Sequence, residues 1–176
     1  MKNIIAFGAS NSKTSINKQL ATYASSLLKD TEVEVLDLND FDVPTYSVDL
    51  EGKSGIPDNA QHLLNKIMSS DGLIISLAEH NGAYTAIFKS LFDWMSRIDV
   101  KLFKQKPMLL MSTSPGARGG QSVFEIAENR FPIHDANIVA KFSLPSFNDN
   151  FKEDKIVDAD LKASLVEAVN TLAERL

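Results

Sequence analysis

The sequence of 176 residues contains no cysteine, which excludes disulfide bonds, thiolate metal sites and Cys nucleophiles. It has only three histidines, His62, His80 and His134, and their wide spacing does not predict a metal site. No apolar run approaches the roughly 18–20 residues that span a bilayer. The first apolar run begins at the third residue, so we expect no signal peptide, no membrane partner and a cytoplasmic location.

Basic residues are also few, since 18 Lys and Arg stand against 23 Asp and Glu and give a net charge of -5. A chain with this charge and no Lys/Arg block is not expected to bind nucleic acid. The Gly-x-Ser-x-Gly and His-Glu-x-x-His motifs are absent as well. What remains is an ordinary globular composition, 44% apolar, at a length that predicts one domain over residues 1–176.

Short apolar runs alternate with helical patterns along the whole chain. We expect strands near residues 3–7, 32–38, 73–77, 107–112 and 137–142, and helices beginning near residues 16, 57, 84, 123 and 158. Asp58 and Gln61 resemble a capping box for the second helix, and residues 39–55 look like a loop. The pattern predicts an α/β fold, a doubly wound five-stranded parallel sheet of order 2-1-3-4-5 with helices on both faces.

In a sheet of this order, ligands bind beyond the carboxyl ends of the strands, at the switch point between strands 1 and 3. The loops after strands 1, 3 and 4 are polar or Gly-rich, and they would meet there. We therefore treat these three loops as one candidate site.

The first loop, residues 8–15, is rich in Ser, Thr and Asn and leads into a helix. Free N–H groups and the positive dipole end at a helix start favour a phosphate, but an ordinary capped helix explains the same residues equally well. A Walker loop does not fit, because Lys13-Thr14 comes one residue early when counted from Gly8. A dinucleotide fingerprint does not fit either, because Ser10 and Lys13 replace its later glycines. The donors expected for a phosphate are Ser10, Ser12, Ser15, the backbone of Ile16, and Asn17.

The other two loops suit a flat ring. Residues 79–83 form an abrupt polar turn after an apolar strand, and residues 112–120 contain three glycines, which allow a ring to approach the main chain closely. Solvated turns are the simpler alternative for both. A phosphate at one loop and a flat ring between two others together describe flavin mononucleotide, FMN.

The three loops resemble, in order, the motifs of the NAD(P)H-dependent FMN reductases, flavodoxin-like flavoproteins that include quinone and azo-dye reductases. The family motif Gly-Ser-x-Arg-x-x-Ser-x-Asn is matched by residues 9–17, with Ser12 in place of the Arg. Pro-Glu-Tyr-Asn is matched by residues 78–81, with Ala78 and His80 in place of Pro and Tyr, followed by Asp93 and Trp94. Ser-Pro-Gly-x-x-Gly-Gly is intact from residue 114 to residue 120.

The resemblance implies an FMN-dependent oxidoreductase that passes hydride from NADPH or NADH to FMN and on to a quinone, an azo compound or free flavin. The flavin carries the chemistry, so no catalytic side chain is expected. The residues implied to line the ring are Glu79, His80, Asn81, Gly82, Ser114, Pro115, Gly116, Gly119 and Gly120. A flavodoxin-type electron carrier and a non-catalytic flavodoxin-like binding module are the alternatives. The acceptor, the choice between NADH and NADPH, and the effect of Ser12 on cofactor binding stay open.

The helix around residues 87–95 is apolar on more than one face. Burial in the core is the simpler explanation. Together with the resemblance, however, this pattern predicts a homodimer, or a tetramer, formed through this helix with the flavin pocket near the interface.

Overall fold

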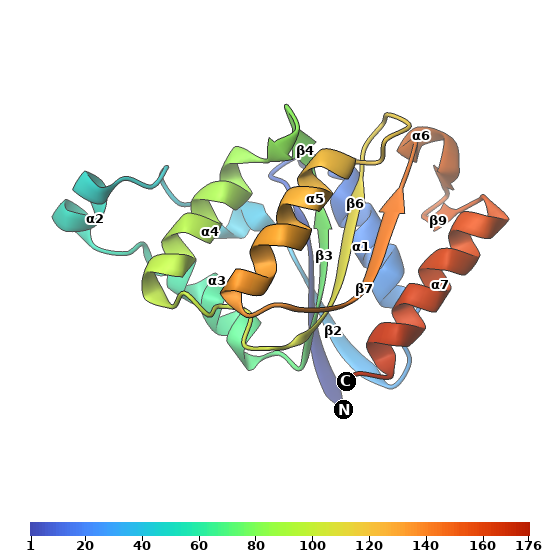
Figure 1. The fold of residues 1–176 in the computed structure, drawn as a ribbon, viewed down its shortest axis with the longest axis horizontal. Coiled ribbons are helices and arrows are strands. Elements are labelled where there is room, and N and C mark those ends of the chain that lie inside the picture. Colours follow the sequence, from blue (N-terminus) through green and yellow to red (C-terminus); the bar gives the residue numbers. More distant parts are fainter.

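A five-stranded parallel sheet forms the centre of the computed structural model, which describes residues 1–176 (Figure 1). Its strands are β1 (Lys2–Ala9), β2 (Thr31–Leu36), β3 (Gly72–Leu77), β6 (Pro107–Thr113) and β7 (Asn137–Leu144). They pair in the order β2-β1-β3-β6-β7, so the predicted order 2-1-3-4-5 is confirmed. No helix is both long enough and apolar enough to cross a membrane.

Helices cover both faces of the sheet, as predicted. On one face lie α1 (Ile16–Ser26) and α7 (Ala159–Ala173), and on the other lie α3 (Asp58–Ser69), α4 (Ala86–Ile98) and α5 (Gln121–Arg130). The apolar run of β1 is continuous because both of its faces are buried. Ile4 packs on the face covered by α1 and α7, and Ile5 packs on the face covered by α3, α4 and α5. Central parallel strands are buried on both faces and therefore lose the alternation of polar and apolar residues.

The carboxyl ends of three strands are level with one another. Ala9 pairs with Leu77, and Leu77 pairs with Ser112, so β1, β3 and β6 end at the same edge of the sheet. The three loops of the candidate site leave the sheet from this edge.

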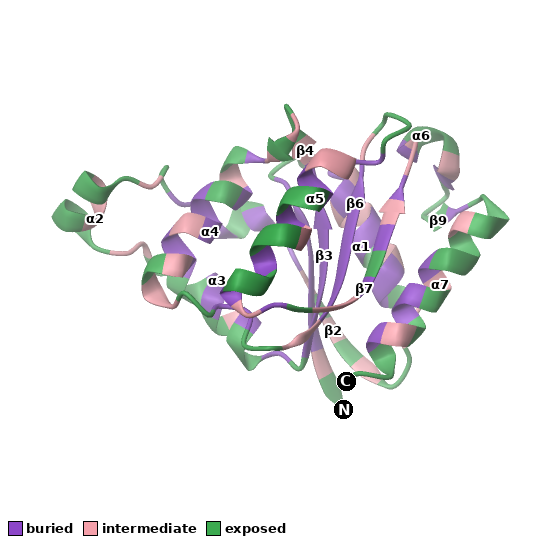
Figure 2. Cartoon of the chain, in the orientation of Figure 1, coloured by how far each residue is buried: buried purple, intermediate pink, exposed green.

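The prediction for residues 32–55 was wrong in part. The strand ends at Leu36, and the segment predicted as loop contains a 3₁₀ helix, η1 (Leu38–Phe41), and a helix, α2 (Val48–Ser54). Ser47 Oγ accepts the Leu50 N–H and caps α2. No residue of α2 is buried, and the helix projects beside α4 (Figures 1 and 2). A helix without a buried face has no apolar periodicity to read.

The predicted capping box of the second helix was also wrong. Asp58 is the first residue of α3 instead of its cap, and the capping residue, Pro57, offers no side-chain bond. The Gln61 amide donates to Asn65 Oδ1, one turn further along the helix. Predicting a cap from residue types therefore missed the boundary by one residue.

The apolar faces of α4 are filled by the chain itself. Phe88, Phe92 and Trp94 are buried, at 1%, 5% and 0% exposure. Phe92 packs against Phe131 of η2 (Phe131–His134), and Trp94 Nε1 donates to the Pro44 carbonyl at the base of the α2 segment. Burial within one chain therefore explains the aromatic pattern that the sequence had associated with a dimer.

The remaining elements are small. A hairpin of β4 (Glu79–His80) and β5 (Ala83–Tyr84) follows β3. After β7 come α6 (Phe147–Asn150) and a hairpin of β8 (Phe151–Lys152) and β9 (Lys155–Ile156). The β4–β5 hairpin matters most here, because it carries the second loop of the candidate site.

Candidate functional site

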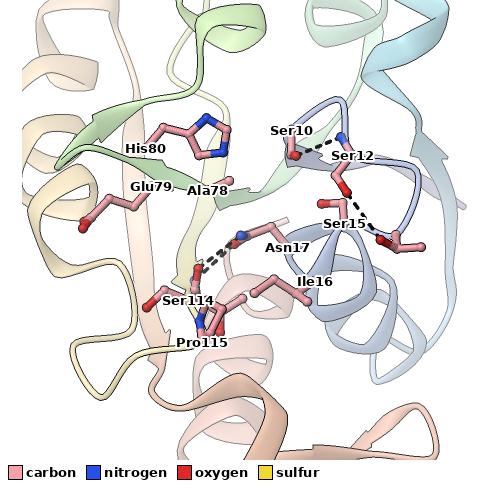
Figure 3. A pocket seen from close by; sticks show the side chains of 12 residues that line it. Ser10, Ser12, Ser15, Ile16, Asn17, Ala78, Glu79, His80, Ser114 and Pro115 are labelled. Atoms are coloured by element: carbon pink, nitrogen blue, oxygen red, sulfur yellow. Dashed lines mark hydrogen bonds between the residues drawn. The ribbon is translucent and has the colours of Figure 1, made fainter.

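The three loops converge on one cavity of about 190 Å³ at the carboxyl edge of the sheet (Figure 3). Its walls come from the loop after β1, the start of the β4–β5 hairpin and the loop after β6. The residues that line it are Ser10, Ser12, Thr14, Ser15, Ile16, Asn17, Ala78, Glu79, His80, Thr113, Ser114 and Pro115.

The first loop presents unpaired donors at the start of α1. Ser15 is the N-cap, and its Oγ accepts the Lys18 N–H at 3.1 Å. The backbone N–H groups of Ile16 and Asn17 have no acceptor within the chain. Such groups carry partial positive charge at the positive end of the helix dipole, so this wall suits an anion.

Neither of the two lysines near this loop, Lys13 and Lys18, lines the cavity, so the donors on its wall are neutral. Lys18 Nζ lies 2.6 Å from Asp37 Oδ2. The hydrogen bond from Lys18, followed by the one from the Asn39 backbone, lowers the pKa of Asp37 to about 2. Lys18 is therefore already paired, while Lys13 makes no ion pair and is exposed.

Asn17 has a different role from the one that its residue type suggested. Asn17 is 2% exposed, and its side chain makes three hydrogen bonds inside the protein. Oδ1 accepts from Ser76 Oγ at 2.7 Å and from the Thr113 N–H at 3.1 Å, while Nδ2 donates to the Thr113 carbonyl. The amide joins α1 to the ends of β3 and β6, so the donors that Asn17 has left for a ligand are its backbone N–H and the second N–H of Nδ2.

The approach of α1 to β1 depends on Gly8, which the sequence analysis did not include among the site residues. A Cβ at Gly8 would lie 2.3 Å from Lys18 N and 2.7 Å from Asn17 C. The signal available was a glycine inside an apolar strand, which marks close approach of another segment. Without a side chain at this position, the first turn of α1 packs directly on the strand.

The second loop is a tight hairpin. His80 pairs with Ala83, so Asn81 and Gly82 are the two turn residues, and both have positive φ, 52° and 76°. This is the Asn-Gly signature of a type I′ turn. His80 lines the cavity, whereas Asn81 and Gly82 lie at the hairpin tip outside it.

Glu79 connects the second loop to the helix that follows the third. Its Oε2 accepts the Val123 N–H of α5 at 3.0 Å. The N-cap of α5 is Gly120, which offers no side-chain bond, so the Glu79 carboxylate satisfies an N–H of the first turn from a distant loop. Glu79 lines the cavity, and its bond to Val123 holds the hairpin against the start of α5.

The third loop is held in place by hydrogen bonds that its backbone carbonyls accept from neighbouring residues. Gly119 O accepts from Ser112 Oγ and Ser143 Oγ, and Gly116 O accepts from the Ser146 N–H. Gly120 has φ 79° and turns the chain into α5. These glycines shape the turn while Ser114 and Pro115 reach the cavity.

The cavity thus brings together nine of the fourteen residues predicted for the site: Ser10, Ser12, Ser15, Ile16, Asn17, Glu79, His80, Ser114 and Pro115. The other five, Asn81, Gly82, Gly116, Gly119 and Gly120, belong to the same loops without lining it. Thr14, Ala78 and Thr113 line it as well and were not predicted. Loop membership can be read from sequence, whereas the direction of a loop side chain cannot.

A family model described as NADPH-dependent FMN reductase matches residues 2–149. The chain belongs to the NADPH-dependent FMN reductase family. It is therefore an NAD(P)H-dependent oxidoreductase with FMN as cofactor, and the resemblance read from the three loops is confirmed. The flavodoxin-type carrier and the non-catalytic module are not favoured.

Two relatives are similar to the chain over different lengths. The reductase is 30% identical over 146 residues to an uncharacterized protein of Mycoplasma pneumoniae, over 80% of this chain and 86% of that protein. It is 32% identical over 79 residues to the quinone reductase of Escherichia coli strain K12, over only 45% of this chain and 42% of that enzyme.

Solved structures show the same fold. The flavoenzyme NAD(P)H:(acceptor) oxidoreductase FerB of Paracoccus denitrificans superposes with a TM-score of 0.77 at 22% identity, covering 99% of this reductase and 97% of FerB. An azoreductase of Bacillus anthracis str. Sterne gives a TM-score of 0.66 at 16% identity, covering 99% of this chain and all of that one. At these identities the likeness supports the fold.

Proposed function

We propose that the three-loop cavity is the FMN site of this reductase, with the phosphate at the start of α1 and the ring between the hairpin and the third loop. The observation that carries this proposal is the pair of unpaired N–H groups of Ile16 and Asn17 at the cavity wall. Neutral hydroxyls and a helix start bind a phosphate dianion without an arginine, which fits Ser12 in place of the family Arg.

The chain's own residues position the cofactor. The hydroxyls of Ser10 and Ser15 each accept a backbone N–H, which leaves their protons free to donate to phosphate oxygens. His80 and Pro115 stand on opposing walls and would contact the ring. Bound FMN supplies the hydride chemistry, and the protein supplies orientation and hydrogen-bond donors.

We further propose that the electron acceptor is a small molecule, namely a quinone, an azo compound or free flavin. The quinone reductase and azoreductase among the similar proteins support this class. One domain over residues 1–176 provides the whole site, because both core layers pack on the same sheet.

Replacing Ser15 by aspartate tests the phosphate position. Aspartate caps a helix as well as serine does, so the apoprotein of Ser15→Asp should keep its thermal midpoint within a few degrees. Its carboxylate would oppose the phosphate, so we expect the dissociation constant for FMN, measured by quenching of flavin fluorescence, to rise by about 100-fold or more.

The matched control is Ser47→Asp, the same change at the N-cap of α2, which should leave FMN binding unchanged. Purified wild-type protein should show the flavin absorption band and lose it on addition of NADPH with a quinone withheld. Equal FMN affinity of the two variants would contradict the phosphate position, and absence of FMN uptake by the wild type would contradict the site.

We also propose a homodimer through the outer side of α4, with the neighbouring exposed side chains Ile126 and Ile133 in the interface. These are 39% and 52% exposed; Ile126 lines one cavity together with residues of α4, and Ile126 and Ile133 together line another. Light scattering at micromolar concentration should give twice 19.4 kDa. Ile133→Glu should give the monomer mass, whereas Val157→Glu, at a 50% exposed valine, should not. A monomeric wild type would contradict the proposal.

A further inference from the structure

A second cavity, of about 380 Å³, lies between α4 and the segment formed by α5 and η2. It is lined by Tyr84, Lys89, Phe92, Asp93, Ser96, Ile126, Arg130 and His134, and it shares no residue with the three-loop cavity. Its volume falls within the range of small-molecule sites.

Two of the three buried side-chain polar atoms that lack a hydrogen-bond partner belong to residues that line this cavity. They are Tyr84 Oη and His134 Nε2, and His134 is only 4% exposed. Buried polar groups nearly always have a hydrogen-bond partner in native proteins. Two unpaired atoms in residues around one cavity therefore indicate that a hydrogen-bonding group enters it.

The hydrogen-bonding character of both atoms is defined. His134 Nδ1 lies 2.8 Å from the Val100 carbonyl, which can only accept, so Nδ1 carries the proton. Burial lowers the pKa of His134, so the ring is neutral and Nε2 is an acceptor. Burial raises the pKa of Tyr84, so its hydroxyl stays protonated and donates. A partner of the Tyr84 hydroxyl would therefore accept, and a partner of His134 Nε2 would donate; a hydroxyl group can do either.

The other residues that line the cavity indicate which further chemical groups a ligand would carry. The Arg130 guanidinium makes no ion pair or hydrogen bond within the chain, and its charge lowers the pKa of both Tyr84 and His134. The other cation of the lining, Lys89, is paired with Asp93. The rings of Tyr84 and Phe92 meet edge to face and offer an aromatic wall. An unpaired arginine attracts a carboxylate, and aromatic walls favour a planar ring.

We propose that this cavity binds a small hydroxylated aromatic carboxylate, at a site separate from the flavin. The hydroxyl of the ligand pairs with Tyr84 and His134, its ring packs on Phe92, and its carboxylate faces Arg130. Ile126 belongs both to this lining and to the face through which we propose the dimer, so the site is tested on the native assembly.

The probe is 4-hydroxybenzoate, titrated by calorimetry into the FMN-saturated enzyme and into the apoprotein. We expect binding of equal strength to both forms. Benzoate, which lacks the hydroxyl, and phenol, which lacks the carboxylate, should each bind at least about fivefold more weakly. Displacement of the probe by FMN would overturn the proposal, because it would put the probe in the three-loop cavity, and so would absence of binding. Neither result bears on FMN uptake by the other site.

Three variants assign the contacts. Arg130→Gln should weaken 4-hydroxybenzoate about fivefold or more and leave phenol unchanged, while Tyr84→Phe, which removes one oxygen, should weaken phenol and leave benzoate unchanged. The control Arg175→Gln removes another exposed arginine and should change nothing. Circular dichroism verifies that each variant is folded. Unchanged affinity of 4-hydroxybenzoate in both Arg130→Gln and Tyr84→Phe would overturn the proposal.

Discussion

Gly8→Ala is expected to lower the free energy of unfolding by about 3 kcal/mol or more. The added methyl group would lie 2.3 Å from Lys18 N and 2.7 Å from the Lys18 Cα, and both are main-chain atoms. No rotamer change relieves such a contact, so β1 and α1 have to move apart. Because the first turn of α1 forms the phosphate wall, we expect FMN affinity to fall at least about tenfold as well.

Urea unfolding of the apoprotein measures the first effect, and flavin fluorescence measures the second. The matched control is Gly52→Ala in α2, where an added Cβ meets nothing within 4 Å. That change should stabilise the protein by roughly 0.5–1 kcal/mol, because alanine favours the helix interior. If Gly8→Ala behaved like Gly52→Ala, the close packing of α1 on β1 would not limit either stability or cofactor binding.

The sheet could be predicted because burial on both faces leaves a direct mark on a sequence. Strand β3 is apolar from Leu73 to Leu77 apart from Ser76, and all its residues are buried, so its central position follows from composition alone. Strand β2 alternates, and it lies at the edge of the sheet. Once five strands alternate with helices, handedness and short connections leave few orders.

Features without a buried apolar face could not be predicted in this way. Helix α2 depends on the Ser47 cap and on bonds at its base, where Tyr46 Oη donates to Glu51 and Arg97 pairs with the same carboxylate. None of these contacts produces a regular spacing of apolar residues that could be recognised in the sequence. A polar segment with two glycines, Gly52 and Gly55, therefore reads as loop although it contains two turns of helix.

In the candidate site, too, local features could be predicted from the sequence and long-range contacts could not. The cap at Ser15 and the turn at residues 81–82 are local, so residue types and spacing predict them. Glu79 instead bonds to Val123, 44 positions away, and its role appears only when α5 packs against the hairpin. The three loops are therefore visible in the sequence, whereas the difference between residues that face the cavity and residues that hold its walls together is not.

Asn17→Ala should show this difference most clearly. The change removes three hydrogen bonds and leaves the Thr113 N–H, the Thr113 carbonyl and the Ser76 hydroxyl buried without partners. Each such group costs about 1–3 kcal/mol, partly relieved by entering water, so we expect a loss of about 3 kcal/mol. For a chain of this length the thermal midpoint of the apoprotein should fall by about 6–12 °C.

The control is Asn65→Ala, at an exposed asparagine inside α3 whose Oδ1 accepts only from Gln61. It should leave the thermal midpoint unchanged or slightly raised, because alanine favours helices. FMN affinity should fall only in Asn17→Ala, since the amide holds α1 against β3 and β6. A large loss of FMN affinity with an unchanged midpoint of the apoprotein would mean instead that the Asn17 amide contacts the phosphate directly. That contact would use the second N–H of Asn17 Nδ2, for which the chain provides no acceptor.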